Sequence, residues 1–426
     1  MKLLVLGSGG REHALSWRLQ RDADVREVVT APGNPGTASV GRNVPLDLSS
    51  PEAVLALADA EKVDLTVVGP EAPLERGVAD LFRRHGRPIV GPTRAGAALE
   101  CSKAHAKDFM ARYAIPTARF VVCTDLGSAL DAVSGRDFGF PVVVKADGLA
   151  AGKGVTIAAT RAEADDAIRG AMVDRQFGAA GSRLVIEECL TGPEVSMFYL
   201  LDGVTAAFLG SAQDHKRIWD DDRGPNTGGM GAFAPSPLAT ADLERQVRQR
   251  IVQPVLDGHR HTGEPYVGFL YVSLMLTPTG PKVIEFNVRF GDPEAQAVMP
   301  LLEGSFASLL ESAAEGAIGN ASMAIGDDRT VGVVLASRGY PASSKGGRVI
   351  SGLEEAAAVA GVTVFHAGTK FERGHVVTAG GRVLTVVARR RTFEAAVESA
   401  YLAVDAIRFD GMQYRRDIGR KALARV

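Results

Sequence analysis

Short apolar runs alternate with stretches of helical spacing over the first hundred residues. The apolar runs predict four strands, at 3–6, 28–30, 65–68 and 89–90. The stretches between them predict helices at 11–21, 51–60 and 74–85. Strands this short that alternate with helices favour an open parallel sheet covered on both faces. The chain is therefore expected to begin with an open α/β domain.

Glycine and proline cluster where three of these strands end, at 7–10, 32–36 and 69–70. Ligands of open α/β sheets bind at that carboxyl edge. The first turn matches a dinucleotide fingerprint at Gly7 and Gly9, but Glu12 stands where the third glycine belongs. We therefore favour a turn whose backbone N–H groups bind a phosphate monoester. A nicotinamide dinucleotide site and a plain structural turn are the alternatives.

The pattern changes twice further along the chain. A helix at 102–112 precedes a β-rich segment with strands at 142–145, 155–159 and 184–188 and a helix near 161–172. Beyond residue 330, the pattern predicts a strand at 331–336 and a long helix at 393–407. The expected fold class is α/β and α+β multidomain. We expect an N-terminal α/β domain at 1–102, a central domain at 103–326 with a β-rich lid at about 120–190, and a small C-terminal mixed α/β domain at 327–426.

Composition narrows the class of protein. The chain has 426 residues, of which 46% are hydrophobic and 23% charged, and a formal net charge of −2. These values are ordinary for a globular protein and give no sign of binding to nucleic acid or to a membrane. The three cysteines lie far apart and are expected to be reduced. With no signal peptide and no long apolar segment, we expect a cytoplasmic protein that is a monomer, with a weak homodimer as the alternative.

A row of three polar side chains follows the apolar run 282–284. Glu285, Asn287 and Arg289 alternate with apolar residues, so on a strand they point to one face. A carboxylate and an amide are oxygen ligands for Mg²⁺, and a guanidinium binds phosphate or carboxylate. Because such a row would be costly in a packed core, it predicts a cleft that holds a metal ion and an anionic substrate.

A glycine-rich loop joins two predicted strands near residue 150. It differs from a Walker motif because only three residues separate Gly148 from Gly152, and Gly154 replaces the Ser or Thr after Lys153. We interpret it as a hairpin lid over a triphosphate, with Lys145 reaching a phosphate as a point charge. The alternative is a surface hairpin with a solvated lysine.

Two further polar stretches are less specific. The turn at 187–194 offers backbone groups to an adenine edge, and Glu194 offers a carboxylate to ribose hydroxyls, although such a turn alone is usually solvated. Residues 213–231 are dense in charge and glycine, which suits a loop that closes on a small polar ligand. His259 and His261 have no third ligand nearby in the sequence, so we expect a surface position rather than a zinc site.

Together these stretches resemble the ATP-grasp ligases and, among them, the glycinamide ribonucleotide synthetase family of purine biosynthesis. The resemblance runs through the chain, at 7–13, 32–34, 69–71, 145–155, 224–231, 285–296, 366–370 and 415–419. It implies an N-terminal open parallel sheet, an ATP-grasp core with a β-rich lid, and a small C-terminal domain. It also implies that ATP drives the ligation of glycine to 5-phosphoribosylamine through a glycyl phosphate, which gives glycinamide ribonucleotide, ADP and phosphate.

The resemblance also implies roles for particular residues. Glu285 and Asn287 would hold Mg²⁺ or Mn²⁺, and Arg289 would steady the transferring phosphoryl group or the acyl oxygen. The residues expected to bind ATP are Lys103, Lys145, Gly152, Lys153, Gly154, Glu187, Leu190 and Glu194. Those expected to bind glycine or phosphoribosylamine are Gly9, Gly10, Pro32, Gly33, Asn34, Glu71, Asp214, Lys216, Asn226, Arg289 and Gly291. Asp214 would accept the glycine ammonium, and the catalytic set is Lys145, Asp214 and Arg289.

One departure from the ATP-grasp pattern bears on the metal. Members commonly carry another metal-binding acid on the preceding strand, but residues 271–276 contain none. Mg²⁺ tolerates this because it retains water and phosphate ligands. Three alternatives stay open: an ATP-grasp ligase or carboxylase with other substrates, a nicotinamide-dependent oxidoreductase, and a binding protein without catalysis. The missing third glycine weighs against the second, and the intact set of Glu285, Asn287, Arg289 and Lys145 weighs against the third.

Overall fold

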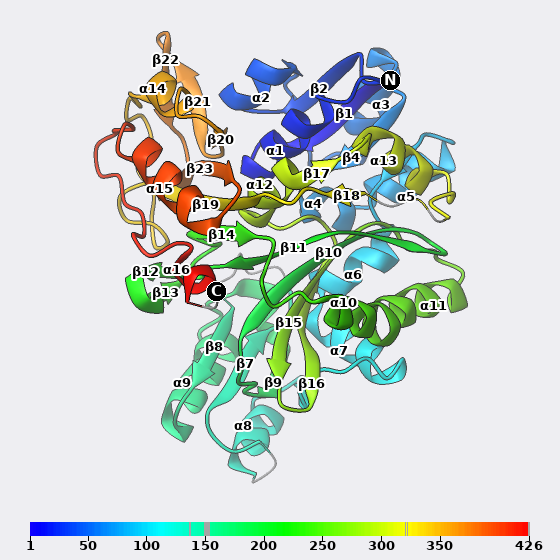
Figure 1. Ribbon diagram of the computed structural model, residues 1–426. Helices are drawn as coiled ribbons and strands as arrows, with labels where there is room; N and C mark the ends of the chain where they lie inside the picture. The colour runs from blue at the N-terminus through cyan, green and yellow to red at the C-terminus, as the bar shows by residue number, and fades with distance from the viewer. Residues whose placement is uncertain (136–137, 149–153, 320, 322, 425–426) are drawn as a thin grey trace.

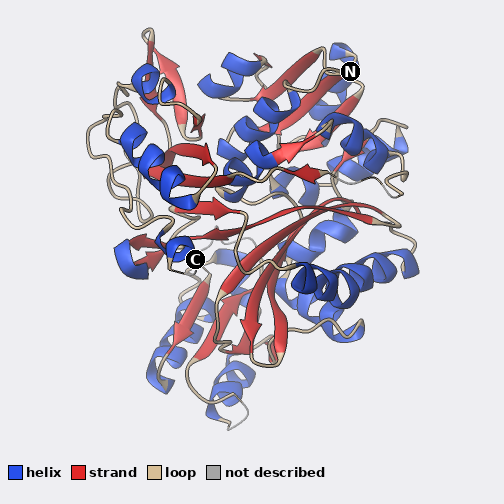
Figure 2. Ribbon diagram, in the orientation of Figure 1, coloured by secondary structure: helices blue, strands red, loops and turns tan. Residues whose placement is uncertain are grey.

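Three β-sheets of four or more strands organise the computed structural model, which describes residues 1–135, 138–148, 154–319, 321 and 323–424. Figure 1 shows the N-terminal sheet at the top, a small sheet at the bottom and a long sheet between them. Figure 2 gives the same view by secondary structure and shows helices lying beside each of the three sheets.

The N-terminal sheet is parallel throughout, in the order β3-β2-β1-β4-β5. Its strands are β1 (Lys2–Gly7), β2 (Glu27–Pro32), β3 (Arg42–Asn43), β4 (Leu65–Val68) and β5 (Ile89–Val90). The accompanying helices are α1 (Gly10–Leu19), α2 (Pro35–Val40), α3 (Pro51–Glu61), α4 (Glu71–Glu75), α5 (Val78–Arg84) and α6 (Arg94–Cys101). The four predicted strands and the open parallel sheet are confirmed.

The prediction of one continuous helix at 74–85 in this domain is wrong. The stretch 74–85 is divided between α4 and α5, and the break lies at Gly77, whose φ is +85°. Glycine adopts this left-handed conformation without the steric cost that a side chain would add. Two other predicted helices end earlier than expected, at Leu19 and Val404.

The small sheet lies within the segment that the sequence assigns to a lid. It is antiparallel in the order β6-β9-β7-β8, with strands β6 (Phe120–Cys123), β7 (Val142–Ala146), β8 (Val155–Ala158) and β9 (Leu184–Glu188). Two helices, α8 (Leu126–Ser134) and α9 (Arg161–Met172), share its apolar core. The predicted hairpin is confirmed, because Lys145 of β7 pairs with Val155 of β8.

The long sheet has eight antiparallel strands among the described residues, in the order β16-β15-β10-β11-β14-β19-β23-β20. They are β10 (Glu194–Asp202), β11 (Ala206–Asp214), β14 (Gly231–Ala234), β15 (Val267–Thr277), β16 (Gly280–Asn287), β19 (Arg329–Ala336), β20 (Val362–His366) and β23 (Arg382–Arg390). Because β14 pairs with β19, the sheet continues across the expected boundary at 326/327. The three domain limits stay predictions.

Helices and short hairpins complete the chain. The remaining α-helices are α7 (Lys103–Arg112), α10 (Ala241–Val247), α11 (Gln253–His261), α12 (Glu294–Val298), α13 (Phe306–Ala314), α14 (Leu353–Ala357), α15 (Phe393–Val404) and α16 (Arg420–Leu423). The hairpins are β12 (Arg217–Trp219) with β13 (Arg223–Asn226) and β21 (Thr369–Glu372) with β22 (His375–Thr378). A further antiparallel pair, β17 (Leu302–Glu303) with β18 (Ala324–Ile325), encloses α13 in the sequence.

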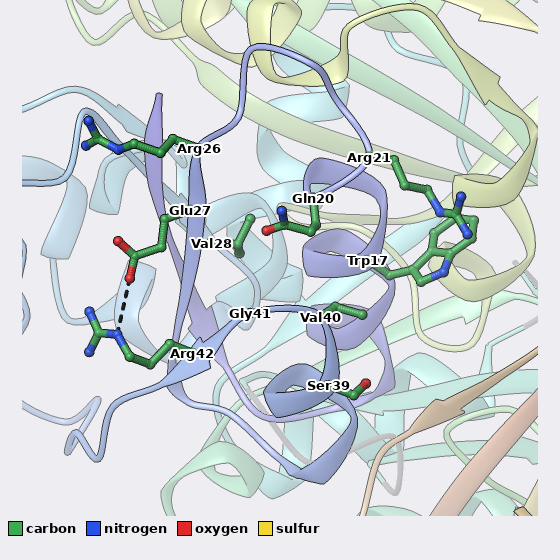
Figure 3. Close-up of a pocket in the computed structure, with 10 residues that line it drawn as sticks. All are labelled: Trp17, Gln20, Arg21, Arg26, Glu27, Val28, Ser39, Val40, Gly41 and Arg42. Carbon is green, nitrogen blue, oxygen red and sulfur yellow. Dashed lines mark hydrogen bonds and ion pairs between the residues drawn. The ribbon is translucent and has the colours of Figure 1, made fainter. Parts of the chain in front are cut away.

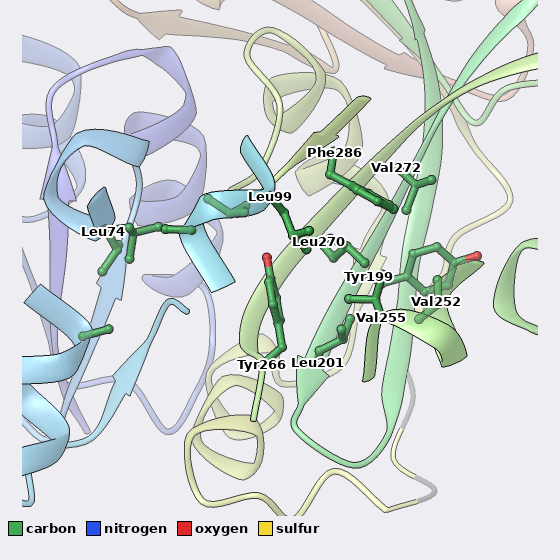
Figure 4. Packing of buried hydrophobic residues seen from close by; sticks show 14 of the residues in the cluster. Leu74, Leu99, Tyr199, Leu201, Val252, Val255, Tyr266, Leu270, Val272 and Phe286 are labelled. Atoms are coloured by element: carbon green, nitrogen blue, oxygen red, sulfur yellow. The ribbon is translucent and has the colours of Figure 1, made fainter. Parts of the chain in front are cut away.

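The apolar core between the N-terminal domain and the long sheet orients the end of β16. Figure 4 shows Leu74 and Leu99 on one side of this core and Val272 and Phe286 on the other. Phe286 is only 2% exposed, and its strand neighbours Glu285 and Asn287 point to the opposite face. Because a slip of one residue would bury the polar pair instead, packing of this phenylalanine fixes the register of the row.

The histidine pair on α11 corrects one prediction. His261 is exposed, but His259 is only 3% exposed and stacks against Phe109, with ring centroids 5.2 Å apart. Burial is the main reason that the pKa of His259 falls to about 4. The predicted surface position is therefore right for His261 and wrong for His259, because residues two apart on a helix do not share a face.

Two simpler predictions concern cysteine and the membrane. Cys101, Cys123 and Cys189 are all free thiols, as expected. Across the part of the chain that the structure describes, no helix combines the length and the apolar character that a membrane crossing requires.

Candidate active site

A cavity of about 1600 Å³ lies between the small sheet and the long sheet and reaches the start of α4. It brings together thirteen of the predicted residues: Glu71, Lys103, Lys145, Gly154, Glu187, Leu190, Glu194, Asp214, Lys216, Asn226, Glu285, Asn287 and Arg289. Among the described residues of the predicted set, Gly9, Gly10, Pro32, Gly33, Asn34 and Gly291 are not part of its lining. Gly152 and Lys153 lie outside the described residues.

Glu285 and Asn287 form an oxygen-rich pair on the cavity face of β16. They pair in register with Ser273 and Tyr271 of β15, a strand that carries no acidic residue. Among the described residues, neither side chain has a hydrogen bond or an ion pair with another side chain, although most charged groups around them are paired. A carboxylate and an amide that are open to a cavity have the chemistry of a Mg²⁺ or Mn²⁺ site whose remaining ligands are water and phosphate.

A buried cluster of two lysines and one glutamate lies at the base of the small sheet. Glu187 forms ion pairs with Lys145 at 2.9 Å and with Lys107 at 3.0 Å, and all three side chains are at most 6% exposed. Lys107 also donates a hydrogen bond to Thr117 at 2.7 Å, and burial is the main reason that its pKa falls to about 8. The cluster leaves one net positive charge in a nearly closed environment, which is suited to an anionic group.

Lys103 extends this positive region along α7. Its ammonium group donates to the carbonyl of Gly148 at 3.0 Å, which ties the helix to the start of the glycine-rich loop. Burial lowers the pKa of Lys103, and the nearby Glu285 opposes that effect. Lys107 is not among the residues predicted from the sequence, although it lies four residues after Lys103 and hence on the same helix face.

Apolar side chains from both sheets line the cavity beside the lysines. They include Val143 of β7, Ile157 of β8, Leu190 after β9, Met275 of β15 and Ile284 of β16. Ligand pockets are mostly apolar with a few polar groups, so apolar walls with a charged end suit a molecule with one flat ring and one polar tail.

Arg289 lies just beyond the end of β16 and is held by two carboxylates. It pairs with Glu71 at 3.2 Å and with Glu100 at 2.8 Å. Burial lowers the pKa of Arg289, but the two carboxylates outweigh this effect and hold the pKa above its ordinary value. Sequence analysis did not identify Glu100, because α6 brings it to the cavity only through packing against β16. Glu71, predicted to bind ribose hydroxyls, positions this guanidinium.

Asp214, Lys216 and Glu194 form a second charged group, where β11 ends and β10 begins. Lys216 pairs with Glu194 at 2.5 Å, so the acid expected to bind ribose already has a cationic partner. Burial raises the pKa of Asp214, and the nearby Lys216 opposes this rise. The cavity therefore holds a carboxylate, Asp214, whose charge is only partly compensated and which is suited to an ammonium ligand.

The loop before β14 lies against the segment that follows β16. A Cβ atom on Gly229, whose φ is +111°, would lie 2.5 Å from the Cδ of Pro293. Arg382 joins the two segments by donating to the carbonyls of Gly228 and Asp292, at 2.6 and 2.5 Å. The glycines of this loop thus permit a close approach to the polar row, and Asn226 lines the same cavity.

The first glycine turn contains an internal carboxylate. The N–H of Gly9 donates to Glu12 at 2.6 Å, and Cβ atoms on Gly7 and Gly69 would lie 2.5 and 2.2 Å from the Glu12 side chain. Glu12 therefore fills the space where a dinucleotide fingerprint has its third glycine, and its charge disfavours a pyrophosphate there. The phosphate-binding role of Gly9 stays a prediction, and it would require competition with Glu12 for this N–H group.

The second turn is built around Asn34, which caps α2 and spans two domains. Its side chain accepts hydrogen bonds from Gly36 and Thr37 and donates to the carbonyls of Ser8 and His366, at 2.8 and 2.9 Å. The first turn also contacts α12, because a Cβ atom on Gly10 would lie 2.3 Å from the amide nitrogen of Gln296. The roles of Gly10, Pro32, Gly33 and Asn34 in substrate binding stay predictions.

A smaller cavity of about 510 Å³ opens at the edge of the N-terminal sheet (Figure 3). The guanidinium of Arg21 lies 4.2 Å from the Trp17 ring centroid, and Arg42 pairs with Glu27 at 3.1 Å. None of the predicted site residues that the structure describes lines this cavity. The larger cavity, which gathers the predicted residues, is therefore the candidate active site.

Comparison with known proteins places the chain in a family. Models of the phosphoribosylglycinamide synthetase N domain, ATP-grasp (A) domain and C domain match residues 1–100, 101–295 and 330–421. The chain belongs to the phosphoribosylglycinamide synthetase family. This confirms the resemblance read from the motifs.

Relatives that match over almost their whole length support the same family assignment. The phosphoribosylamine–glycine ligases of Pseudomonas aeruginosa and Xanthomonas axonopodis pv. citri are 48% and 49% identical to the chain, and each match covers 100% of this chain and 99% of the relative. The solved structure of phosphoribosylamine–glycine ligase from Thermotoga maritima has a TM-score of 0.87 at 34% identity and covers 98% of this chain and 100% of that one. The expected multidomain fold with an ATP-grasp core is confirmed.

A more distant structure shares the fold alone. The biotin carboxylase domain of Hydrogenobacter thermophilus 2-oxoglutarate carboxylase, solved with MgADP and bicarbonate, has a TM-score of 0.73 at 17% identity and covers 97% of this chain and 91% of that one. Membership of the phosphoribosylglycinamide synthetase family does not assign roles to single residues, which rest on the geometry above.

Proposed function

We propose that the chain catalyses the ATP-dependent ligation of glycine to 5-phosphoribosylamine in purine biosynthesis, with glycinamide ribonucleotide, ADP and phosphate as products. One observation carries the proposal. A single cavity contains an uncommitted carboxylate and amide, Glu285 and Asn287, together with buried lysines and a partly compensated carboxylate, Asp214. These groups match a metal–triphosphate and an amino acid. We also propose that the enzyme works in the cytoplasm as a monomer.

The chemistry proceeds through an activated acid, because a free carboxylate is a poor acceptor for an amine. A glycine carboxylate oxygen attacks the γ-phosphorus of ATP, and ADP leaves, which gives glycyl phosphate. The amine of phosphoribosylamine then attacks the acyl carbon and expels phosphate. Phosphoryl transfer depends on positioning and charge neutralisation more than on a protein nucleophile. A lid that excludes water would protect the acyl phosphate from hydrolysis.

The apolar slot and the lysines would bind ATP. The side chains between the two sheets suit the adenine ring, and backbone groups beside Leu190 suit its polar edge. Lys103 and Lys145 would contact the phosphates as point charges, and Glu187 would hold Lys145 in place. The loop that contains Gly152, Lys153 and Gly154 would cover the triphosphate. Glu194 would bind the ribose hydroxyls while it keeps its pair with Lys216.

Glu285 and Asn287 would hold Mg²⁺ or Mn²⁺ beside those phosphates. A bound ion would neutralise charge on the β- and γ-phosphates during transfer. Asp214 would accept the ammonium of glycine. Arg289, whose position Glu71 and Glu100 fix, would steady the acyl oxygen.

Phosphoribosylamine would enter from the side of the N-terminal domain. Its phosphate would bind the turns at Gly9, Gly10 and 32–34, and Glu71 would bind its ribose hydroxyls. Lys216 and Asn226 would contact the substrates from the loop beside β11. Gly291 is not part of the cavity lining, so its role in substrate binding would be indirect.

A coupled assay of ADP release tests the proposed function. The purified chain is incubated with ATP, Mg²⁺, glycine and phosphoribosylamine, and each component is omitted in turn. We expect sustained ADP release only in the complete mixture, with glycinamide ribonucleotide formed in equal amount. ADP release that does not depend on glycine would contradict the proposal.

Replacing Asp214 with asparagine tests the glycine site. The neutral amide keeps the shape of the side chain but removes the charge that faces the ammonium, so the KM for glycine is expected to rise by about tenfold to a hundredfold. The KM for ATP should change by less than about threefold, because Asp214 faces the amino acid rather than the phosphates. Steady-state kinetics with each substrate varied gives both values.

The matched control for this change is Asp405→Asn, at an exposed position that follows α15. It is expected to behave like the wild type in both measurements. Small and equal changes in the two KM values of Asp214→Asn would refute the role of Asp214 in glycine binding.

A further inference from the structure

Glu294 is a buried carboxylic acid on the cavity wall to which the proposed function gives no task. It is the first residue of α12, is 3% exposed, and lines the same cavity as Asp214 and Arg289. Tyr271 of β15 donates a hydrogen bond to one carboxyl oxygen of Glu294 at 2.9 Å. The same tyrosine oxygen lies 2.8 Å from the hydroxyl of Ser196 on β10. A chain of two hydroxyl groups thus orients this acid within the cavity.

Gly291 makes room for the other carboxyl oxygen. A Cβ atom at this position would lie 2.5 Å from Oε2 of Glu294 and 2.7 Å from its Cδ. Any larger residue would therefore displace the carboxyl group. This gives Gly291, predicted from the sequence as a substrate-binding residue, an indirect role through Glu294.

The surroundings of Glu294 make it an acid that titrates near neutrality. Burial and, next, the charge of Asp214 raise the pKa of Glu294 to about 7, while the Tyr271 hydrogen bond and Arg289 act in the opposite direction. Two carboxyl groups whose environments hold their protons differently can divide acid–base roles between them. Here Asp214 has Lys216 as a cationic neighbour, whereas the side-chain hydrogen bond that Glu294 accepts comes from the neutral hydroxyl of Tyr271.

Two ion pairs lie on or beside the elements packed against α12. Arg11 and Glu12 of α1 bind each other at 2.6 Å, and Asp292 pairs with Arg382 of β23 at 3.2 Å. The titratable groups that act on the carboxyl group of Glu294 are Asp214 of β11, Tyr271 of β15 and Arg289.

We propose that Glu294 is the general base of the ligation step and that Tyr271 and Gly291 position its carboxylate. This inference rests on the proposed function. The amine nitrogen of phosphoribosylamine forms a bond to the acyl carbon of glycyl phosphate, and the bond from that carbon to the phosphate oxygen breaks. Phosphate leaves with the electron pair, and the proton lost by the nitrogen passes to the carboxylate of Glu294. Water later removes this proton and restores the base.

The pH dependence of kcat tests the inference, because a general base acts only when it is deprotonated. Wild-type kcat is expected to rise with pH through about 7 and then to level off. Glu294→Gln should lower the plateau of kcat by about 10²–10⁴-fold and abolish this rise, since a positioned base contributes a factor of that size. The KM values for ATP and glycine should change little.

Two neighbouring changes should move the pH profile in opposite directions. Tyr271→Phe removes a hydrogen bond that stabilises the charged carboxylate, so the rise should move to higher pH and kcat should recover at alkaline pH. Asp214→Asn removes a negative neighbour, so the rise should move to lower pH when glycine is saturating. A purely structural role of Glu294 would lower activity at all pH values without these shifts.

The controls separate this inference from the proposed function. Glu311→Gln, at an exposed position on α13, should keep the wild-type profile, and thermal unfolding checks that each variant is folded. A wild-type protein without glycine-dependent ADP release would contradict the proposed function itself. Active wild type with an unchanged pH rise in Glu294→Gln would overturn only the inference. A folded Glu294→Gln whose effect is confined to the KM for glycine would also overturn it. If Glu294→Gln does not fold, absence of the Tyr271→Phe shift would overturn it.

Discussion

Glu285→Gln is expected to lower kcat by at least about a hundredfold and to raise the Mg²⁺ concentration needed for half-maximal rate. Glu285 supplies the only carboxylate of the proposed metal pair, and β15 beside it carries no acid that could replace it. Loss of charge neutralisation by a metal costs several kcal/mol, and about 1.4 kcal/mol corresponds to tenfold in rate. Initial rates measured over a range of Mg²⁺ concentrations give both quantities.

The same experiment with Glu303→Gln is the matched control. Glu303 is half exposed, lies outside the cavity and pairs with Arg389, so the change should leave the Mg²⁺ dependence as in the wild type. Near-normal activity of Glu285→Gln at limiting Mg²⁺ would show that this carboxylate does not hold the ion.

Lys145→Met is expected to lower kcat/KM for ATP by about tenfold to a hundredfold. A hydrogen bond to a charged group contributes roughly 1.5–3 kcal/mol, which corresponds to a factor of that size. The Lys145 side chain is 6% exposed and its ammonium group is held by Glu187, so it is pre-positioned for a phosphate. Methionine keeps the aliphatic length, and Lys107 remains to pair with Glu187. Steady-state kinetics with ATP varied measures the effect.

Lys282→Met provides a lysine control on β16. Lys282 also pairs with a glutamate, Glu188, at 2.9 Å, but it does not line the cavity. The control should therefore retain wild-type kcat/KM for ATP. Thermal unfolding of both variants shows whether loss of an ion pair has weakened the fold, and equal kinetic losses in the two would argue against a phosphate contact by Lys145.

Patterns of neighbouring residues in the sequence were sufficient to predict those elements of the fold that form between neighbouring segments. Alternating apolar runs predicted the parallel N-terminal sheet, and two β-rich runs around glycines predicted the hairpin of β7 and β8. The break at Gly77 was missed because an isolated glycine in a helical pattern is often tolerated. The eight-stranded sheet was not foreseen, since pairing of β14 with β19 joins segments about a hundred residues apart.

In the candidate site too, residues placed by local sequence order were predictable, whereas residues placed by the packing of distant segments were not. Glu285 and Asn287 were predictable because strand alternation alone puts them on one face. Glu100 and Lys107 were not identified, because they reach the cavity only when α6 and α7 pack beside β16. Glu12 is visible in the sequence as a departure from the third glycine of a dinucleotide fingerprint. Its structural meaning, a carboxylate that binds the N–H of Gly9, depends on the side-chain conformation.

Transfer of oxygen from glycine to phosphate is the most direct test of the account. Glycine labelled with ¹⁸O in its carboxylate is converted in the complete reaction, and the released inorganic phosphate is analysed by mass spectrometry. If the cavity activates glycine as glycyl phosphate, one phosphate that carries one ¹⁸O atom will be released for every glycinamide ribonucleotide formed. Phosphate without the label, at the same yield of product, would contradict the account.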